Sequence, residues 1–262
     1  MEIREKNGIK YCVFKNIEET GLVSHAFSTR VGGVSKGVFD SLNVSYTRGD
    51  EKENVDENIK RICSVIDVQP ENIVCGHQVH DKKVLRVTKE DIGKDISGYD
   101  AFITNEKGVV LSTFHADCVP VFLVDTKNKA VAMIHSGWRG TAKKICCETI
   151  EKMKEEFGTE PKNIVAAIGP SIGVCCFQVD EPVVKEFEKA ADFANEFIFD
   201  DKNCADHYKI DLWGINKRLL ESCGVTNIEV TNRCTMCSEE LFYSHRRMGN
   251  ERGSMAAYIC LK

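Results

Sequence analysis

Short apolar runs rich in β-branched and aromatic residues recur along the chain, and this pattern predicts many β-strands. Three of these runs, VVLSTF, VPVFLVD and AVAMI, follow one another within residues 109–134. The other predicted strands cover residues 10–16, 22–28, 72–79, 83–88, 99–104, 163–168, 227–231 and 254–260. Glycine and polar clusters between the runs are typical of the turns that separate strands.

Four segments instead place apolar residues at helical spacing. In the first, Val55, Ile59, Ile62 and Ile66 share one face, which predicts a helix over residues 51–66. The others are a helix that opens at Thr141 and closes at Gly158, a charged helix over Glu181–Ala190, and a helix from Leu212 that ends before Gly224. Glycine directly after the last apolar position is a common helix stop.

The order of these elements predicts the fold class. Strands outnumber helices, and several strands follow one another without an intervening helix. A simple alternation of strands and helices is therefore not expected. No linker, repeat or low-complexity tract divides the chain. We predict an α/β sandwich built on mixed sheets and folded as a single domain over residues 1–262.

Composition narrows the class of protein. The 262 residues carry a net charge of -5, which argues against general nucleic-acid binding but leaves room for a local basic pocket. No apolar run reaches the ~18 residues of a membrane span, and the charged start MEIREKNGIKYCVF lacks the apolar core of a signal peptide. The 13 scattered cysteines then indicate free thiols in a reducing compartment. We expect a cytoplasmic protein with no membrane or nucleic-acid partner.

Reactive side chains follow three of the predicted strands. HADC places Cys118 after one strand, HSGWRG begins with His135 after another, and GHQVH ends at His80 after a third. Side chains at neighbouring strand ends can converge on one point. Zinc binds thiolate and imidazole, and a catalytic zinc keeps three protein ligands and an open position whose water has a lowered pKa. His80, Cys118 and His135 are therefore a candidate transition-metal site.

Two other interpretations of these residues stay open. The histidines can be polar strand caps and Cys118 a small core residue, because their wide separation in the chain is not a local metal-binding motif. Alternatively, Cys118 can be a catalytic nucleophile whose thiolate a histidine activates.

Polar neighbours of the candidate ligands suggest further roles. His115 and Asp117 flank Cys118, where they can orient the ligands or transfer protons. Arg139 lies in the HSGWRGT segment, and its guanidinium can hold an anionic or planar substrate or form a surface ion pair. Arg30 lies in the glycine-rich segment TRVGGVSKG, which either approaches an anion or is a plain surface connection.

Four other cysteines are not expected to form a metal site, and Cys234 and Cys237 are interpreted as structural. Cys175 and Cys176 are adjacent, and adjacent residues of a strand point to opposite faces, which makes them poor joint ligands. Cys234 and Cys237 have C-x-x-C spacing, but no second such pair completes a four-cysteine zinc site.

Taken together, the motifs resemble those of one family over about residues 22–260. They are, in order, TRVGGVS from Thr29, SLNVS from Ser41, QVH ending at His80, HADCVP from His115, HSGWRGT from His135, GPSIG from Gly169 with CCF, DLW from Asp211 and SHRR from Ser244. In this order they resemble the laccase-domain family, the YfiH/YlmD-like proteins once labelled multicopper polyphenol oxidases. HADCVP and HSGWRGT are the most specific of them.

The resemblance implies a fold, a reaction and a cofactor. The fold would be an α/β sandwich of two facing mixed β-sheets flanked by helices. The activity would be phosphorolysis of adenosine, inosine, guanosine and methylthioadenosine, together with hydrolytic deamination of adenosine. The cofactor would be one zinc ion, with copper possible, and the family's ligands match His80, Cys118 and His135.

From the resemblance we also expect particular substrates and site residues. The partners would be a small nucleoside and phosphate, and the protein a monomer or weak dimer. Expected catalytic residues are His115, Asp117 and Arg139, and expected substrate and phosphate ligands are Arg30, Asn43 and Arg246.

One position departs from the family, and three other functions stay open. The family motif usually reads SYRR, whereas His245 here replaces the tyrosine. A copper-dependent polyphenol oxidase partly fits the Cys-His-His set, although the 7 histidines are few for a multicopper enzyme. A cysteine hydrolase using Cys118 and a non-enzymatic metal-binding protein are the others.

Overall fold

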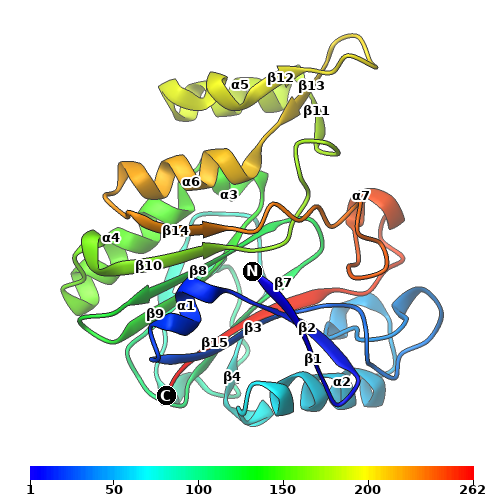
Figure 1. Ribbon diagram of the computed structural model, residues 1–262, viewed down its shortest axis with the longest axis vertical. Helices are drawn as coiled ribbons and strands as arrows, with labels where there is room; N and C mark the ends of the chain where they lie inside the picture. Colours follow the sequence, from blue (N-terminus) through cyan, green and yellow to red (C-terminus); the bar gives the residue numbers. More distant parts are fainter.

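A computed structural model describes residues 1–262, and Figure 1 shows layered strands with helices on the outside. The strands are β1 (Glu2–Lys6), β2 (Ile9–Val13), β3 (Val23–Ser28), β4 (Ile73–Val74), β5 (Val84–Arg86), β6 (Ala101–Thr104), β7 (Val110–His115), β8 (Val119–Asp125), β9 (Ala130–Ser136), β10 (Ile164–Ile168), β11 (Gln178–Asp180), β12 (Ile198–Asp200), β13 (His207–Ile210), β14 (Asn227–Val230) and β15 (Met255–Leu261). The helices are α1 (Lys15–Glu19), α2 (Lys52–Val65), α3 (Trp138–Ala142), α4 (Ile145–Phe157), α5 (Glu181–Ala190), α6 (Leu212–Ser222) and α7 (His245–Met248).

The strands form two large mixed sheets and one small sheet. The first sheet has the strand order β1-β2-β3-β15-β7-β4, and only β4 and β7 pair in parallel. The second has the order β14-β10-β8-β9-β6-β5, with parallel pairs at its two edges. The small sheet is β11-β13-β12. Consecutive strands such as β8 and β9 are antiparallel neighbours, which agrees with the prediction that strands and helices do not simply alternate.

The two large sheets face each other across a shared core. Side chains alternate between the two faces of a strand, and β8 divides its residues accordingly. Phe122 and Val124 join a cluster with Leu111 and Ile259 of the first sheet. Leu123 of the same strand belongs to a different cluster, together with the helices on the outer face. Burying both faces of β8 accounts for its continuous apolar sequence.

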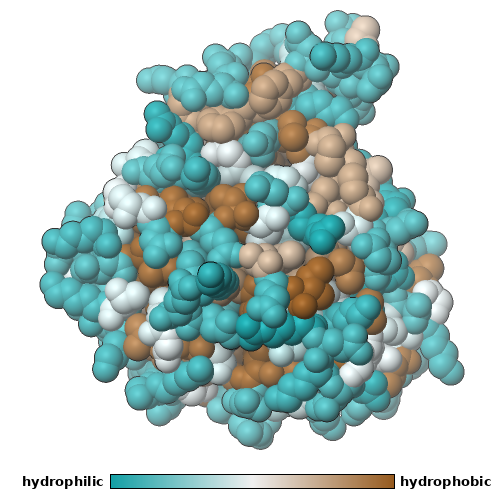
Figure 2. Space-filling model, in the orientation of Figure 1, coloured by the Kyte–Doolittle hydropathy of each residue, from teal (hydrophilic) through white to brown (hydrophobic).

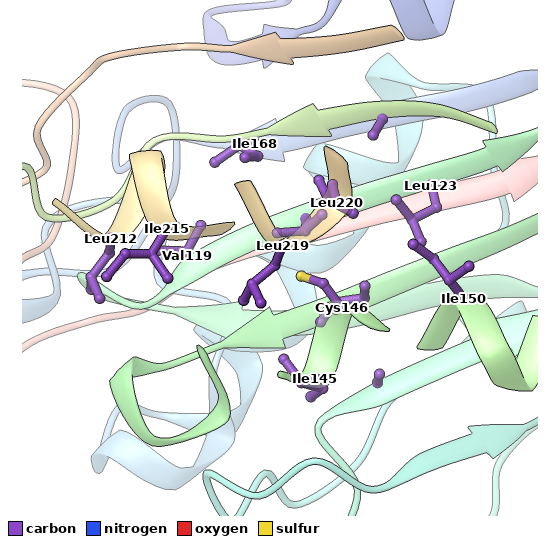
Figure 3. Packing of buried hydrophobic residues seen from close by; sticks show 14 of the residues in the cluster. Val119, Leu123, Ile145, Cys146, Ile150, Ile168, Leu212, Ile215, Leu219 and Leu220 are labelled. Carbon is purple, nitrogen blue, oxygen red and sulfur yellow. The ribbon is translucent and has the colours of Figure 1, made fainter. Parts of the chain in front are cut away.

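Helices cover the outer face of each large sheet. Figure 3 shows Ile150 of α4 and Leu219 of α6 packed near Leu123 and Ile168 of the second sheet. On the far side of the first sheet, α2 contributes apolar residues to a cluster that contains Tyr258 of β15. The order helix, sheet, sheet, helix confirms the α/β sandwich of two facing mixed sheets flanked by helices.

Three predicted elements differ from the structure. The strand predicted over residues 10–16 ends at Val13, and α1 begins at Lys15. The strand predicted over residues 72–79 is only β4, because the chain leaves β7 after Val74 and His77 bridges to Ser97 instead. The helix predicted from Thr141 is two helices, α3 and α4, which are separated at Lys144 by a left-handed backbone conformation with φ of 60°.

The small sheet and α5 lie together at one end of the molecule (Figure 1). The α5 helix was predicted at its observed bounds, whereas the three short strands of this unit were not. Figure 2 shows a mainly hydrophilic surface on which apolar residues form small groups. Among the helices, none combines the length and the apolar character that crossing a membrane requires.

Candidate metal centre and cleft

The fold brings His80, Cys118 and His135 together at one end of the second sheet. Cys118 directly precedes β8, and His135 lies in β9 opposite Pro120 of β8. His80 comes from the loop after β4, and its Nε2 lies 3.8 Å from the Cys118 sulfur. The ligand atoms of all three residues lie within 4.8 Å of one another. The structure therefore brings together the three residues, His80, Cys118 and His135, that the sequence predicted as a site.

The local geometry is suitable for a metal ion. Around a tetrahedral zinc, the usual bond lengths place a sulfur and a nitrogen about 3.6 Å apart, close to the observed separation. Gly137 lies against the cluster, and a Cβ at this position would lie 2.8 Å from Cδ2 of His80 and 3.3 Å from the Cys118 sulfur. The absence of a side chain at Gly137 thus leaves space beside His80 and Cys118 that a Cβ atom would fill.

Asp100 orients two parts of the cluster at once. Its carboxylate is fully buried and accepts hydrogen bonds from the backbone amides of Val79, His80 and Asp81, at 2.9 to 3.1 Å. It also accepts a bond of 2.8 Å from Nδ1 of His135. With Nδ1 engaged, Nε2 of His135 is the nitrogen that faces Cys118, the arrangement found in carboxylate–histidine–zinc sites.

Asp100 was not predicted as a functional residue. Burial alone would raise its pKa, but hydrogen bonds from His135 and the loop amides lower it, so the group stays a carboxylate. The only signal in the sequence is one acidic residue directly before the buried strand β6. Its partners come from a loop and from β9, so only the folded chain reveals its role.

The ligand thiol and imidazole shift each other's pKa. Burial would raise the pKa of Cys118, but the adjacent charge of His135 lowers it to about 6. Burial would lower the pKa of His135, whereas the Cys118 thiolate and the Asp100 carboxylate raise it to about 9. Near neutral pH the metal-free pair is therefore a thiolate and an imidazolium. A cation bound by these residues would meet an existing thiolate and would displace one proton from His135.

His115 is buried beside the cluster but its ring is already hydrogen-bonded. Nδ1 donates to the carbonyl oxygen of Cys118 at 3.1 Å, and Nε2 accepts from the Thr113 hydroxyl at 2.8 Å. Burial keeps its pKa well below the usual value, so the ring is neutral. In these contacts His115 holds the Cys118 loop in place, and no ring nitrogen is left for a proton transfer to a substrate.

Asp117 is similarly occupied. Its carboxylate accepts hydrogen bonds from the hydroxyls of Thr235 and Ser244, at 2.6 and 3.0 Å, and from the backbone amide of Arg246 at 2.7 Å. Only 8% of its surface is exposed. Asp117 thus fastens the C-terminal loop to the metal centre, a positioning role, although it also lines the cleft.

Two cavities meet at the candidate ligands. The larger cleft has a volume of about 670 Å³ and an apolar and aromatic lining that includes Trp138, Ile172, Phe177, Val179 and Leu212. The smaller cavity, about 350 Å³, has a more polar lining that includes Ser45, Thr47, His77, Lys94 and Ser254. His80, Cys118, Arg48 and Arg252 line both cavities. A metal ion held by the ligands would therefore face both spaces.

Arg48 and Arg252 form a cationic pair that sequence reasoning missed. Arg252 is 6% exposed, and its Nη1 donates to the Gly253 carbonyl and the Ser254 hydroxyl. The Nε atoms of both arginines are buried without a hydrogen-bond partner. Burial and the charge of Arg48 lower the pKa of Arg252 to about 10. Neither arginine forms an ion pair with a carboxylate, so the pair is prepared to receive an anion.

The structure does not bring Arg30 and Asn43 into either cavity. Arg30 stacks on the Tyr243 ring at 4.8 Å and donates to the carbonyl of Asp40. Asn43 is fully buried, and its Oδ1 accepts from the backbone amides of Ser45 and Ser254. Both residues support loops around the site, and Asn43 does so next to the arginine pair.

Arg139, Arg246 and His245 all line the larger cleft. Arg139 lies over the Trp138 ring at 4.2 Å and forms no ion pair with a carboxylate. Arg246 donates to the carbonyls of Cys176 and Gln178, so part of its hydrogen-bonding capacity is used by the fold. His245, at the family's tyrosine position, donates from Nδ1 to the Gly249 carbonyl.

Comparison with known proteins shows similarity over nearly the whole chain. The sequence model of the family described as multi-copper polyphenol oxidoreductase laccase matches residues 24–262. A Bacillus subtilis (strain 168) protein named purine nucleoside phosphorylase YlmD is 35% identical over 248 residues, with 90% of this chain and 87% of that protein covered. A Bacteroides thetaiotaomicron protein named purine nucleoside phosphorylase is 34% identical, with 95% of each chain covered.

The fold is also similar to solved structures. The crystal structure of the Bacillus licheniformis hypothetical protein YfiH superposes with a TM-score of 0.92 at 30% sequence identity, and the match covers 99% of both chains. The layered sandwich and the strand ends that carry the candidate ligands therefore belong to an architecture that is already represented experimentally.

The pKa of Cys118 yields a first prediction. In metal-stripped protein, the rate of Cys118 alkylation by iodoacetamide should stay constant from pH 9 to about 7 and fall as the pH passes below about 6, where the thiolate protonates. Zinc should block the reaction. Peptide mass spectrometry measures the rate, with Cys75, whose pKa is raised by burial, as internal comparison. A Cys118 rate that keeps rising about tenfold per pH unit up to pH 9 contradicts the prediction.

The hydrogen bonds of Asp100 lead to a second prediction, which concerns zinc affinity. Replacing Asp100→Asn should weaken zinc binding roughly 10- to 100-fold, because the carboxylate that orients His135 and the His80 loop is lost. Competition with a chromophoric chelator measures the affinity. Asp125→Asn is the matched control, since Asp125 is equally buried and accepts backbone amides at the other end of β8. Equal affinities of the two variants would rule out this role.

Proposed function

This chain belongs to the family described as multi-copper polyphenol oxidoreductase laccase, and from that membership we propose that it is a zinc-dependent purine nucleoside phosphorylase. Its relatives named purine nucleoside phosphorylase supply the reaction class. The proposed reaction splits adenosine, inosine, guanosine or methylthioadenosine with phosphate into the base and a pentose 1-phosphate. The observation that carries the proposal is a cluster of potential metal ligands at the junction of an aromatic cleft and a second cavity, with a pair of arginines that line both.

The larger cleft is the proposed nucleoside site. A volume of about 670 Å³ suits a molecule of nucleoside size. The apolar walls formed by Ile172, Phe177 and Leu212 would contact the purine and ribose faces, and Trp138 adds an aromatic surface. Arg139, which has no carboxylate partner, can donate hydrogen bonds to acceptor atoms of the departing purine. A leaving base that gains negative charge is stabilised in this way.

The arginine pair is the proposed phosphate site. Phosphorolysis requires a phosphate held beside C1′ of the ribose, with its charge balanced by cations. Arg48 and Arg252 line both cavities at their junction, and neither forms an ion pair with a carboxylate, so terminal guanidinium nitrogens can donate to an anion. Guanidinium groups bind phosphate in a bidentate way. Arg246 lies at the cleft wall, and we keep it as a secondary phosphate contact.

His80, Cys118 and His135 would hold the metal ion. One thiolate and two imidazoles match the ligands of catalytic zinc, and the same donors also accept copper. Bound there, the ion supplies Lewis-acid chemistry at the junction of the two cavities. The residues around it keep that junction organised: Asp100 fixes the ligand orientation, His115 holds the Cys118 loop, and Asp117 anchors the C-terminal loop.

Hydrolytic deamination of adenosine to inosine is the second proposed activity. It is favoured by the ligand count, because three protein ligands leave one position of a tetrahedral site open. A metal ion held there would be reachable from the nucleoside cleft, since His80 and Cys118 line it. The same bound nucleoside would then react with water when phosphate is absent.

The alternatives fit the site less completely. A multicopper oxidase needs several clustered histidines, whereas His80 and His135 are the only two whose ring nitrogens converge with a third ligand. A cysteine hydrolase agrees with the thiolate–imidazolium pair of Cys118 and His135. Tight zinc binding to that pair would remove the free nucleophile, so the alkylation experiment separates these two functions. A purely metal-binding protein would leave the cleft without a substrate.

Product analysis tests the proposed function directly. Zinc-loaded protein incubated with adenosine should form adenine only when phosphate is present, and inosine in its absence, as measured by liquid chromatography. Cys118→Ala should abolish both products, because it removes one of three metal ligands. No product from any purine nucleoside, in protein that retains its metal, would overturn the proposal in favour of the oxidase or the binding protein.

The phosphate site predicts a selective kinetic effect. Arg252→Gln should raise the KM for phosphate roughly 10- to 100-fold, the effect of losing a charge-assisted hydrogen bond, while deamination without phosphate changes little. Arg30→Gln is the matched control, because Arg30 lies outside both cavities and should leave the KM unchanged. A raised KM in Arg30→Gln but not in Arg252→Gln would show that phosphate binds elsewhere.

A further inference from the structure

A second group of potential metal ligands lies outside the site described above. Cys175 and Cys176 belong to the loop between β10 and β11, and Cys234 and Cys237 belong to the loop after β14. The four sulfur atoms lie within 4.8 Å of one another. The Cys237 sulfur is 3.7 Å from that of Cys175 and 3.3 Å from that of Cys176. All four cysteines are free thiols.

This arrangement corrects the expectation drawn from the sequence. Adjacent cysteines were expected to point to opposite faces of a strand, but Cys175 and Cys176 lie in a turn that precedes β11. In a turn, neighbouring side chains can point the same way, and here both approach Cys237. The pair therefore supplies the two ligands that the C-x-x-C segment of Cys234 and Cys237 lacked.

The two loops are built against each other around the sulfurs. Ser171 and Cys234 form a β-bridge, and the Thr235 amide donates to the Ser171 carbonyl at 3.0 Å. The backbone amide of Gly173 donates to the Cys234 sulfur at 3.3 Å. Amide hydrogen bonds to sulfur are the usual support of metal-bound thiolates. The site is thus held by the backbone of both loops and does not depend on flexible side chains alone.

The sulfur separations match a tetrahedral metal ion. Zinc–sulfur bonds of about 2.3 Å in tetrahedral geometry place the sulfur atoms about 3.8 Å apart. The two measured separations, 3.3 and 3.7 Å, lie close to this value. In a cytosolic protein, clustered cysteines indicate a metal site more often than a disulfide.

We propose that Cys175, Cys176, Cys234 and Cys237 bind a structural zinc ion, separate from the one held by the His80 cluster. A site with four thiolate ligands has no open position, so this zinc would stabilise the fold and take no part in the reaction. It would tie together two loops that the nucleoside cleft needs. One loop leads into Phe177 of the cleft wall, and the other carries Thr235, which donates to Asp117.

Metal counting on reduced protein tests the proposal. Protein purified anaerobically with zinc should contain two zinc ions per chain by elemental analysis, one for each cluster. Cys118→Ala and Cys237→Ser should each retain one ion, and the double variant none. Cys223→Ser is the matched control and should retain both, since Cys223 belongs to neither cluster.

Cobalt substitution identifies which site is filled. In Cys118→Ala, the remaining cobalt should show the intense thiolate charge-transfer and visible bands of a tetrahedral four-sulfur site. This readout does not require the Cys237→Ser variant to fold. A single zinc per chain in the reduced wild type that is lost in Cys118→Ala would overturn the proposal. A disulfide of Cys237 with Cys175 or Cys176 in the reduced wild type would do so as well. Loss of nucleoside turnover alone would concern the His80 cluster and leave the four-cysteine site standing.

Discussion

The buried carboxylate of Asp100 is the contact on which the candidate metal centre depends. An isolated buried charge is unstable, and here three loop amides and the His135 ring satisfy the carboxylate oxygens. The same bonds place His80, a loop residue whose backbone has a left-handed φ of 58°, beside His135 of β9. The hydrogen bonds that stabilise the buried Asp100 carboxylate thus also hold His80 and His135 close together. A flexible His80 loop would instead lose entropy on binding the ion.

Asp117, the residue directly before Cys118, is a second buried carboxylate that holds separate segments of the chain together. It too is a buried carboxylate whose oxygens are satisfied by distant residues, Thr235 and Ser244, and by the amide of Arg246. Asp100 holds the loop that carries His80, and Asp117 holds the C-terminal segment that carries Ser244 and Arg246. Cys118 lies between these two anchored segments, which explains why a ligand on a loop has a defined position.

The sequence was sufficient to predict the layered α/β fold and the group of side chains that the fold brings together, because the apolar pattern and the order of motifs both lie in local segments of the chain. Apolar runs marked the strands, and residues at strand ends marked His80, Cys118 and His135. Asp100 and Arg252 were missed because their roles come from partners distant in the chain. The cysteine cluster was missed for a related reason, since the conformation of residues 174–176 as a turn decides where two sulfurs point. Local pattern cannot specify a contact between loops.

The hydrogen bonds of the acidic groups around the centre explain how two arginines stay without a carboxylate partner in a protein with a net charge of -5. The acidic groups nearest the ligands, Asp100 and Asp117, have their oxygens filled by amides, hydroxyls and His135. They therefore do not pair with Arg48 and Arg252, whose Nε groups remain without partners at the junction of the cavities. A carboxylate paired with either arginine would compete with phosphate for it. Because amides, hydroxyls and His135 already satisfy these acidic groups, the two arginines keep an unpaired positive charge at the junction of the cavities.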